Sequence, residues 1–156
     1  MSQTSRLLSW YHNTFKDTSL FRDMEAMTEG SPYHRERNVG IHTDMVVAQY
    51  LLAAEKCDTY DLGLLVCIFH DVGKPSSVVH KHNEERGYYK SFPGHEWKSA
   101  RMWEDYVTTN WDTFVRMGLT VTDIYRVGCG DKYTVIPSLK CSWPGNENRH
   151  LKAHHA

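Results

Sequence analysis

The sequence predicts an all-helical fold, and three features of the chain indicate it. The stretch VGIHTDMVVAQYLL (39–52) repeats apolar residues at the spacing of one helix face. The uninterrupted apolar run from Leu62 to Phe69 is typical of a buried helix, which Gly73 and Pro75 end shortly afterwards. No alternating stretch is long enough to indicate a sheet, although TVIPSL (134–139) suits an extended segment.

The expected helices follow one another along most of the chain. In order they are Ser5–Phe15, Ser19–Thr28, Ile41–Glu55, Leu62–Val72, His95–Thr108, Trp111–Met117 and Thr122–Val127. The third and fourth rest on the two apolar patterns above, and the polar turn 56–61 joins them. Consecutive helices with so short a connection pack roughly antiparallel. One long irregular piece remains, Pro75–Gly94, and a loop of that length in a compact domain is usually functional or disordered.

Length and composition favour a single domain, 1–156. A chain of 156 residues fits one domain that buries about two-thirds of its unfolded surface. We expect a core over about 38–137, N-terminal helices within 5–28 and a mobile tail over 145–156. The formal net charge of −1 gives no general attraction to nucleic acid.

The chain carries no sign of export or membrane insertion. It lacks the N-terminal apolar core of a signal peptide, and no stretch approaches the roughly 18 apolar residues that cross a bilayer. The four cysteines show no closely spaced pair of the zinc-binding kind: Cys57, Cys67, Cys129 and Cys141. We therefore expect a cytoplasmic protein with reduced cysteines and no membrane partner.

A histidine–aspartate pair stands at the end of the apolar run. His70 and Asp71 follow Phe69 directly, so a core helix would hold them rigidly at a polar site. His42 lies 28 residues upstream of His70, and antiparallel packing would bring it back beside the pair. Two imidazoles and a carboxylate suit Mn, Fe, Co, Ni or Zn. Read alone, His42 is more often an interior histidine, so a purely structural bundle stays open as an alternative.

The local sequence around the pair resembles a known family. The string HDVGKP (70–75), the helix-borne histidine before it and SFPGHEWKSA (91–100) after it resemble the HD-domain superfamily of metal-dependent phosphohydrolases. These sequence motifs are similar to those of the HD modules of tRNA nucleotidyltransferases and of related bacterial and phage phosphohydrolases. The resemblance covers about residues 38–137 and implies an HD-domain helical bundle.

The same resemblance assigns roles to individual residues. It implies three metal ligands: His42, His70 and Asp71. His95, in the GHE segment, matches a histidine that faces the site and binds a second metal ion or the substrate phosphate. In DIYRVGCGDKYTVIP (123–137), Asp131 falls on an acidic position of the family, whereas Gly130 stands where a histidine is often found. Asp131 is our first candidate for the fourth ligand, ahead of these weaker candidates: Asp123, His150, His154 and His155.

The implied activity is hydrolysis of a phosphate ester by metal-activated water. A divalent ion, whether Mn, Fe, Co, Ni, Mg or Zn, would lower the pKa of a bound water and neutralise the phosphoryl oxygens. We expect a nucleotide or a nucleic-acid end as the substrate, because the 75–94 segment is rich in groups that bind phosphate or stack on bases. These are His80, Lys81, His82, Lys90 and two tyrosines. Lys74, next to the pair, is a further candidate for a phosphate contact.

Other interpretations of the same residues stay open. The 75–94 segment is equally consistent with a solvent-exposed loop that has no function. Lys74 is equally consistent with a surface lysine at a helix end. The departure at Gly130 favours an alternative function, a weakly active or inactive HD-type module that binds a nucleotide or RNA. The sequence specifies no oligomeric state.

Overall fold

The structure, a computed structural model, describes residues 1–29 and 37–133, and for 129–133 it describes the backbone alone. The helices are α1 (Gln3–Asn13), α2 (Ser19–Ala26), α3 (Val39–Ala53), α4 (Tyr60–Phe69), α5 (His95–Thr109), α6 (Trp111–Arg116) and α7 (Val121–Tyr133), with a 3₁₀ turn η1 (Phe15–Asp17) after α1. Each expected helix is present, so the predicted, predominantly helical fold is confirmed. The last helix continues beyond its expected end at Val127.

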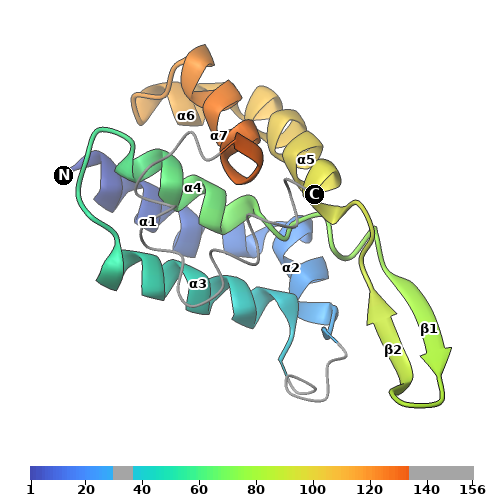
Figure 1. Cartoon of the computed structure of the whole chain (residues 1–156). Helices are drawn as coiled ribbons and strands as arrows, with labels where there is room; N and C mark the ends of the chain where they lie inside the picture. The colour runs from blue at the N-terminus through green and yellow to red at the C-terminus, as the bar shows by residue number, and fades with distance from the viewer. Residues whose placement is uncertain (30–36, 134–156) are drawn as a thin grey trace.

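Helix α4 lies at the centre of the bundle (Figure 1). Its residues from Leu62 to Phe69 are all buried, and α1, α3, α5 and α7 pack around it. Helix α3 runs antiparallel to α4, as predicted (Figure 1). The two helices approach closely at Gly63, where a Cβ atom would collide with the Tyr50 hydroxyl. That hydroxyl donates a hydrogen bond of 2.6 Å to the Tyr60 carbonyl, which fixes the start of α4.

An aromatic cluster joins the N-terminal elements to the end of α4. The ring centroids of Phe15 and Phe69 are 5.0 Å apart, and those of Trp10 and Phe114 are 5.2 Å apart. Tyr106 of α5 contacts Phe15 edge-on at 5.6 Å. Buried aromatic pairs of this kind add about 0.5–1.5 kcal/mol each beyond the area that they bury. The cluster therefore holds the C-terminal end of α4 in place, and the histidine–aspartate pair follows directly after that end.

The start of α3 is fixed by a side-chain cap. The Asn38 side chain accepts a hydrogen bond of 2.8 Å from the Ile41 N–H, as an N-cap residue does. The Val39 N–H donates to the Met27 carbonyl at 2.9 Å, so the residues after α2 pair with the residues before α3. His42 consequently sits on the first turn of a helix whose end is anchored.

The expectation of a structureless segment over Pro75–Gly94 is wrong. Strands β1 (Val79–Asn83) and β2 (Gly87–Ser91) form an antiparallel hairpin that projects from the bundle (Figure 1). Gly87 has a φ of +67°, a conformation that glycine adopts readily at a hairpin turn. Every residue of β1 is exposed, so the strand shows no alternation of apolar and polar residues that could have revealed it. The all-α prediction is corrected to the extent of this small sheet.

None of the described helices is long and apolar enough to span a bilayer. Of the other expectations, the extended segment 134–139 and the mobile tail 145–156 lie outside the described residues.

Candidate metal centre

Three potential metal ligands meet where the first turn of α3 faces the end of α4. Nε2 of His42 lies 3.5 Å, and Nε2 of His70 3.0 Å, from the same Asp71 oxygen, Oδ2. One ligand atom from each of the three residues lies within 4.8 Å of those of the other two. The predicted approach of His42 to the pair is therefore confirmed. It follows from antiparallel packing, because the first turn of one helix then lies beside the last turn of the next.

The hydrogen bond at the far side of the His70 ring sets the proton position on this imidazole. Nδ1 lies 2.7 Å from the Cys67 carbonyl oxygen, which only accepts hydrogen bonds, so Nδ1 carries the proton. A neutral His70 then directs the Nε2 lone pair at Asp71 Oδ2. Two acceptors at 3.0 Å repel each other unless a proton or a metal ion stands between them. The backbone carbonyl thus orients the imidazole as it does for many metal-binding histidines.

Asp71 is kept ionised at the centre of the site. Its side chain is buried, and burial alone would raise the pKa of the carboxyl group. Without a metal ion, the charges of protonated His70 and of Lys74, with hydrogen bonds from His70 and His95 when Nε2 of each also carries a proton, outweigh burial and hold that pKa well below its ordinary value. A buried carboxylate surrounded by nitrogen donors is a strong ligand for a divalent cation.

His42 is favoured in its neutral form. Burial lowers the pKa of this imidazole, the charge of His70 lowers it further, and the charge of Asp71 opposes the change without reversing it. Neutral imidazole is the form that binds a metal ion. The surroundings of His42 therefore suit the side chain to ligation rather than to an ion pair.

His95 faces the second oxygen of the same carboxylate. It is the first residue of α5, and its Nε2 lies 3.3 Å from Asp71 Oδ1. Its Nδ1 lies 3.0 Å from the Phe92 carbonyl oxygen and 2.9 Å from Glu96 Oε2, so Nδ1 carries the proton and Nε2 points to the site. The expectation that His95 faces the site is confirmed, while its binding to a second metal ion or a phosphate stays a prediction.

Gly73 allows α5 to pack directly on the turn that follows Asp71. A Cβ atom at this position would lie 2.7 Å from the Ser99 nitrogen and 2.8 Å from the His95 carbonyl oxygen. The Gly73 N–H donates instead to the Ser99 hydroxyl at 2.9 Å. Glycine is needed here for close approach rather than for an unusual backbone conformation.

Lys74 also belongs to the site, but its charge is already paired. Its Nζ lies 3.2 Å from Glu29 Oε1 and 3.4 Å from Asp71 Oδ2. Burial would lower the pKa of this amine, yet the charges of Asp71 and Glu29 outweigh burial and raise it. Of the two interpretations of Lys74, the surface lysine at a helix end is wrong, because the side chain is largely buried, and contact with phosphate stays a prediction. Sequence reasoning missed Glu29, because an isolated acidic residue beyond a helix gives no signal that the fold brings it to Lys74.

Among the candidates for a fourth metal ligand, the structure shows a different role for Asp123 and does not describe the side chains of the others. The Asp123 carboxylate accepts a hydrogen bond of 2.8 Å from the Thr120 N–H, and the Thr120 hydroxyl accepts one of 3.2 Å from the Asp123 N–H. This reciprocal pair is a capping box at the start of α7, so Asp123 has a structural role. The Asp131 side chain and the terminal histidines His150, His154 and His155 lie outside the described residues.

The hairpin joins the histidine–aspartate pair to His95 and carries the remaining candidates. His80, Lys81 and His82 are exposed on β1. In the strand pairing, His80 lies opposite Lys90 and His82 opposite Tyr88. The Lys90 amine donates to the Thr28 hydroxyl at 2.6 Å and to the Thr28 carbonyl at 3.1 Å, which anchors the base of the hairpin.

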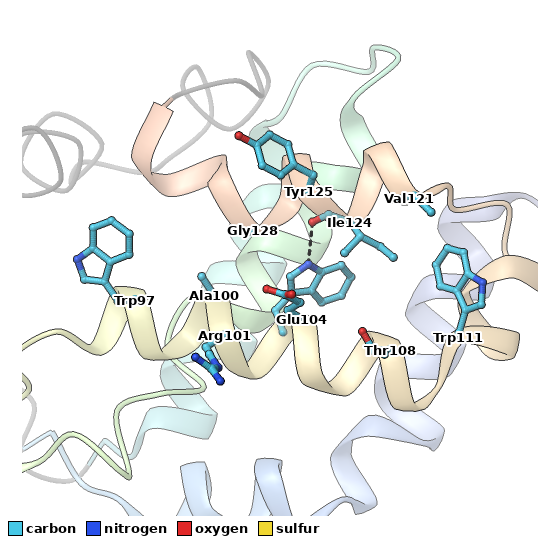
Figure 2. Close-up of a pocket in the computed structure, with 11 residues that line it drawn as sticks. Trp97, Ala100, Arg101, Glu104, Thr108, Trp111, Val121, Ile124, Tyr125 and Gly128 are labelled. Atoms are coloured by element: carbon cyan, nitrogen blue, oxygen red, sulfur yellow. Dashed lines mark hydrogen bonds between the residues drawn. The ribbon is translucent and has the colours of Figure 1, made fainter.

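A separate hollow lies between α5, α6 and α7 (Figure 2). It has a volume of about 680 Å³, and the Trp103 indole, which is one of the groups that line it, donates a hydrogen bond of 3.0 Å to the Ile124 carbonyl. Trp97, Trp111 and Tyr125 stand around it (Figure 2). The metal-centre residues are not among those that line it.

The chain was compared with protein-family models, curated proteins and solved structures, and none of them matches it.

Proposed function

We propose that this chain is a metal-dependent phosphohydrolase of the HD-domain type. The observation that carries the proposal is the convergence of His42 Nε2 and His70 Nε2 on one oxygen of Asp71. Because the Cys67 carbonyl fixes the proton of His70 on Nδ1, a neutral His70 leaves an electron-rich space that suits a cation. Nitrogen and oxygen donors together suit Mn, Fe, Co, Ni or Zn, and the family resemblance adds Mg.

The residues present fit such an ion and the chemistry that it supports. His42, His70 and Asp71 would hold a divalent ion, which would lower the pKa of the attacking water and supply positive charge for the phosphoryl oxygens. His95 Nε2, directed into the site by the contacts of Nδ1 with Phe92 and Glu96, is placed to accept or return a proton. The Glu96 carboxylate would stabilise the imidazolium that results, as the orienting carboxylate does in other acid–base pairs.

We propose a nucleotide or a nucleic-acid end as the substrate. One face of the hairpin groups His80, His82, Tyr88 and Lys90, since directly paired residues project to the same side. It carries no acidic residue along the paired strands, and the ring centroids of His82 and Tyr88 are 4.6 Å apart. Tyr88 is 85% exposed, an arrangement that leaves its ring open to stacking. Cationic side chains bind phosphate and aromatic rings stack on bases, so this face offers groups for both the phosphate and the base of a nucleotide.

The experiment is a substrate screen with purified, metal-reconstituted protein. The panel contains nucleoside mono- and triphosphates, 2′,3′-cyclic phosphates and 3′-phosphorylated oligonucleotides, with release of phosphate or of a new ester end as the signal. The matched control is Asp71→Ala, taken through the same metal-reconstitution procedure. Turnover by the native chain that the control lacks supports the proposal. Absence of turnover with every metal and substrate, in protein shown to hold the ion, contradicts it.

A second candidate function is a weakly active or inactive module that binds a nucleotide or RNA. The pairing of Lys74 with Glu29 favours it, because that lysine must leave a 3.2 Å ion pair before it can bind phosphate. Binding of an oligonucleotide by metal-loaded protein without any turnover would support this alternative. A purely structural bundle instead predicts that no divalent ion raises the melting temperature, since a ligand of the native state must stabilise it.

A further inference from the structure

Helix α3 has two apolar faces, and among residues 1–29 and 37–133 only one of them is packed against other elements. The inner face consists of buried residues: Val39, Thr43, Val46, Val47 and Tyr50. Among the described elements, α3 packs chiefly against α2 and α4, and it forms an edge of the bundle (Figure 1). The outer face carries Ile41, Met45, Ala48 and Leu52, all of them exposed, with Leu52 at 82%. A helix that is apolar on both sides is expected to be covered on both sides.

The spacing of the outer face indicates what covers it. Positions 41, 45, 48 and 52 are separated by four, three and four residues, which is the spacing of a coiled-coil seam. A seam of this kind packs against another helix rather than against a sheet or a small molecule. The outer face of α3 therefore suits a second helix, and we call its residues Ile41, Met45, Ala48 and Leu52 the outer seam.

The order of residues along the outer seam is self-complementary. If two copies of α3 lie antiparallel about a two-fold axis through the midpoint between residues 46 and 47, Ile41 meets Leu52 of the partner subunit, and Met45 meets the partner's Ala48. The long Met45 side chain then lies against a small residue in both halves of the contact. A two-fold interface requires such self-complementarity.

We propose that the chain forms a homodimer through an antiparallel pair of α3 helices. The contact is modest, because a helix of 15 residues is only about 22 Å long. It buries less than the roughly 800 Å² per partner of a standard interface, so the dimer is expected to dissociate in the micromolar range. No residue of the metal centre contributes to the outer seam, and the proposal stands or falls independently of the phosphohydrolase activity.

The test is sedimentation velocity of the full chain from low micromolar to near-millimolar concentration. Native protein should shift from monomer to dimer over this range. Met45→Glu and Ala48→Lys should each raise the dissociation constant at least about tenfold, because each buries an unpaired charge in the seam. Ala53→Lys, exposed on α3 but outside the seam, is the matched control and should leave association unchanged. Circular dichroism checks that every variant folds.

A mixture of the two charged variants tests the register itself. In the antiparallel pair, Glu introduced at position 45 faces Lys introduced at position 48 of the partner, so a one-to-one mixture should dimerise better than either variant alone. Native protein that stays monomeric throughout overturns the proposal. A native dimer that neither variant weakens also overturns it, because the interface then lies elsewhere. Failure of the mixture to recover association overturns the antiparallel register.

Discussion

The backbone N–H of Gly73 donates a hydrogen bond of 2.9 Å to the Ser99 hydroxyl. This bond joins the turn after Asp71 to the second turn of α5, whose first residue is His95. Two segments that the hairpin separates in the sequence are thereby held against each other. The distance of 3.3 Å between His95 Nε2 and Asp71 Oδ1 depends on that contact.

Gly73→Ala should displace α5 from the turn. The added Cβ atom would lie within 3.0 Å of Ser99, His95 and Lys98, two of these contacts being with backbone atoms that cannot rotate away. We expect a loss of about 1–3 kcal/mol in the free energy of unfolding, measured by urea denaturation. Gly128→Ala is the control, since a Cβ there meets Trp103 only at 3.7 Å and should be neutral or stabilising. An equal effect of the two substitutions would argue against the close-approach role of Gly73.

His70→Ala and Asp71→Ala should each abolish stoichiometric metal binding and leave the helical content largely intact. Each removes one of the few groups that converge on the site, whereas the packing of α4 rests on its apolar residues. Elemental analysis of the purified variants measures the metal, and far-ultraviolet circular dichroism measures the helix. Metal retained at the native level in either variant would refute the assignment of the site.

His95→Ala should lower turnover while the first metal ion stays bound. His95 faces Oδ1 of Asp71, whereas His42 and His70 converge on Oδ2, so the imidazole lies outside the first cluster. Metal content and initial rate are measured on the same preparation. His12→Ala, at an exposed position of α1, is the control for loss of a histidine. If His95→Ala removes the metal as well, His95 is a primary ligand.

In the metal-free protein, His42 should lower the stability of the folded state as the pH falls below about 6.5, the ordinary pKa of histidine. The pKa of His42 is lowered in the folded state, so the unfolded chain binds more protons at this residue and unfolding becomes easier. Asp71 does not contribute in this range, because its pKa lies below about 4 in both states. Urea denaturation with a chelator, from pH 8 to 5, should show a shallower decline for His42→Gln than for the native chain. Parallel curves would contradict the lowered pKa.

Asp131→Asn should weaken metal binding strongly if Asp131 is the fourth ligand. The amide keeps the shape of the side chain but loses the charge that offsets the cation. Deletion from His150 onward should then leave the affinity unchanged. A site completed by the terminal histidines predicts the reverse, with affinity lost on truncation. Metal titration of both variants separates the two accounts, and equal loss in both would leave neither adequate.

The approach of His42 to His70 and Asp71 could be predicted because it depends on local patterns. An apolar run fixes the helix that carries the pair, a helical repeat fixes the helix before it, and a short turn makes the two antiparallel. Each step uses residues that are close in sequence.

Other features escaped prediction for physical reasons. The hairpin buries neither face of β1, so its strands lack the alternation by which a half-buried strand is recognised. Glu29 reaches Lys74 across 45 residues, through the pairing of Thr28 with Asn38 and not through any pattern of its own. The burial of Lys74 depends on that same carboxylate. Tertiary contacts of single polar residues produce no periodic pattern in the sequence from which they could be predicted.

The base of the hairpin is fastened at both ends, by the bond from Gly73 to Ser99 on one side and by that from Lys90 to Thr28 on the other. Its tip, from Glu84 to Arg86, is exposed and takes no part in the apolar core. An insertion or exchange at the tip would therefore leave the metal-centre residues in place. If the proposed function holds, the hairpin would select the substrate and the metal centre would carry out the reaction. A hairpin grafted from another sequence would then be expected to change which molecules bind without changing the reaction itself.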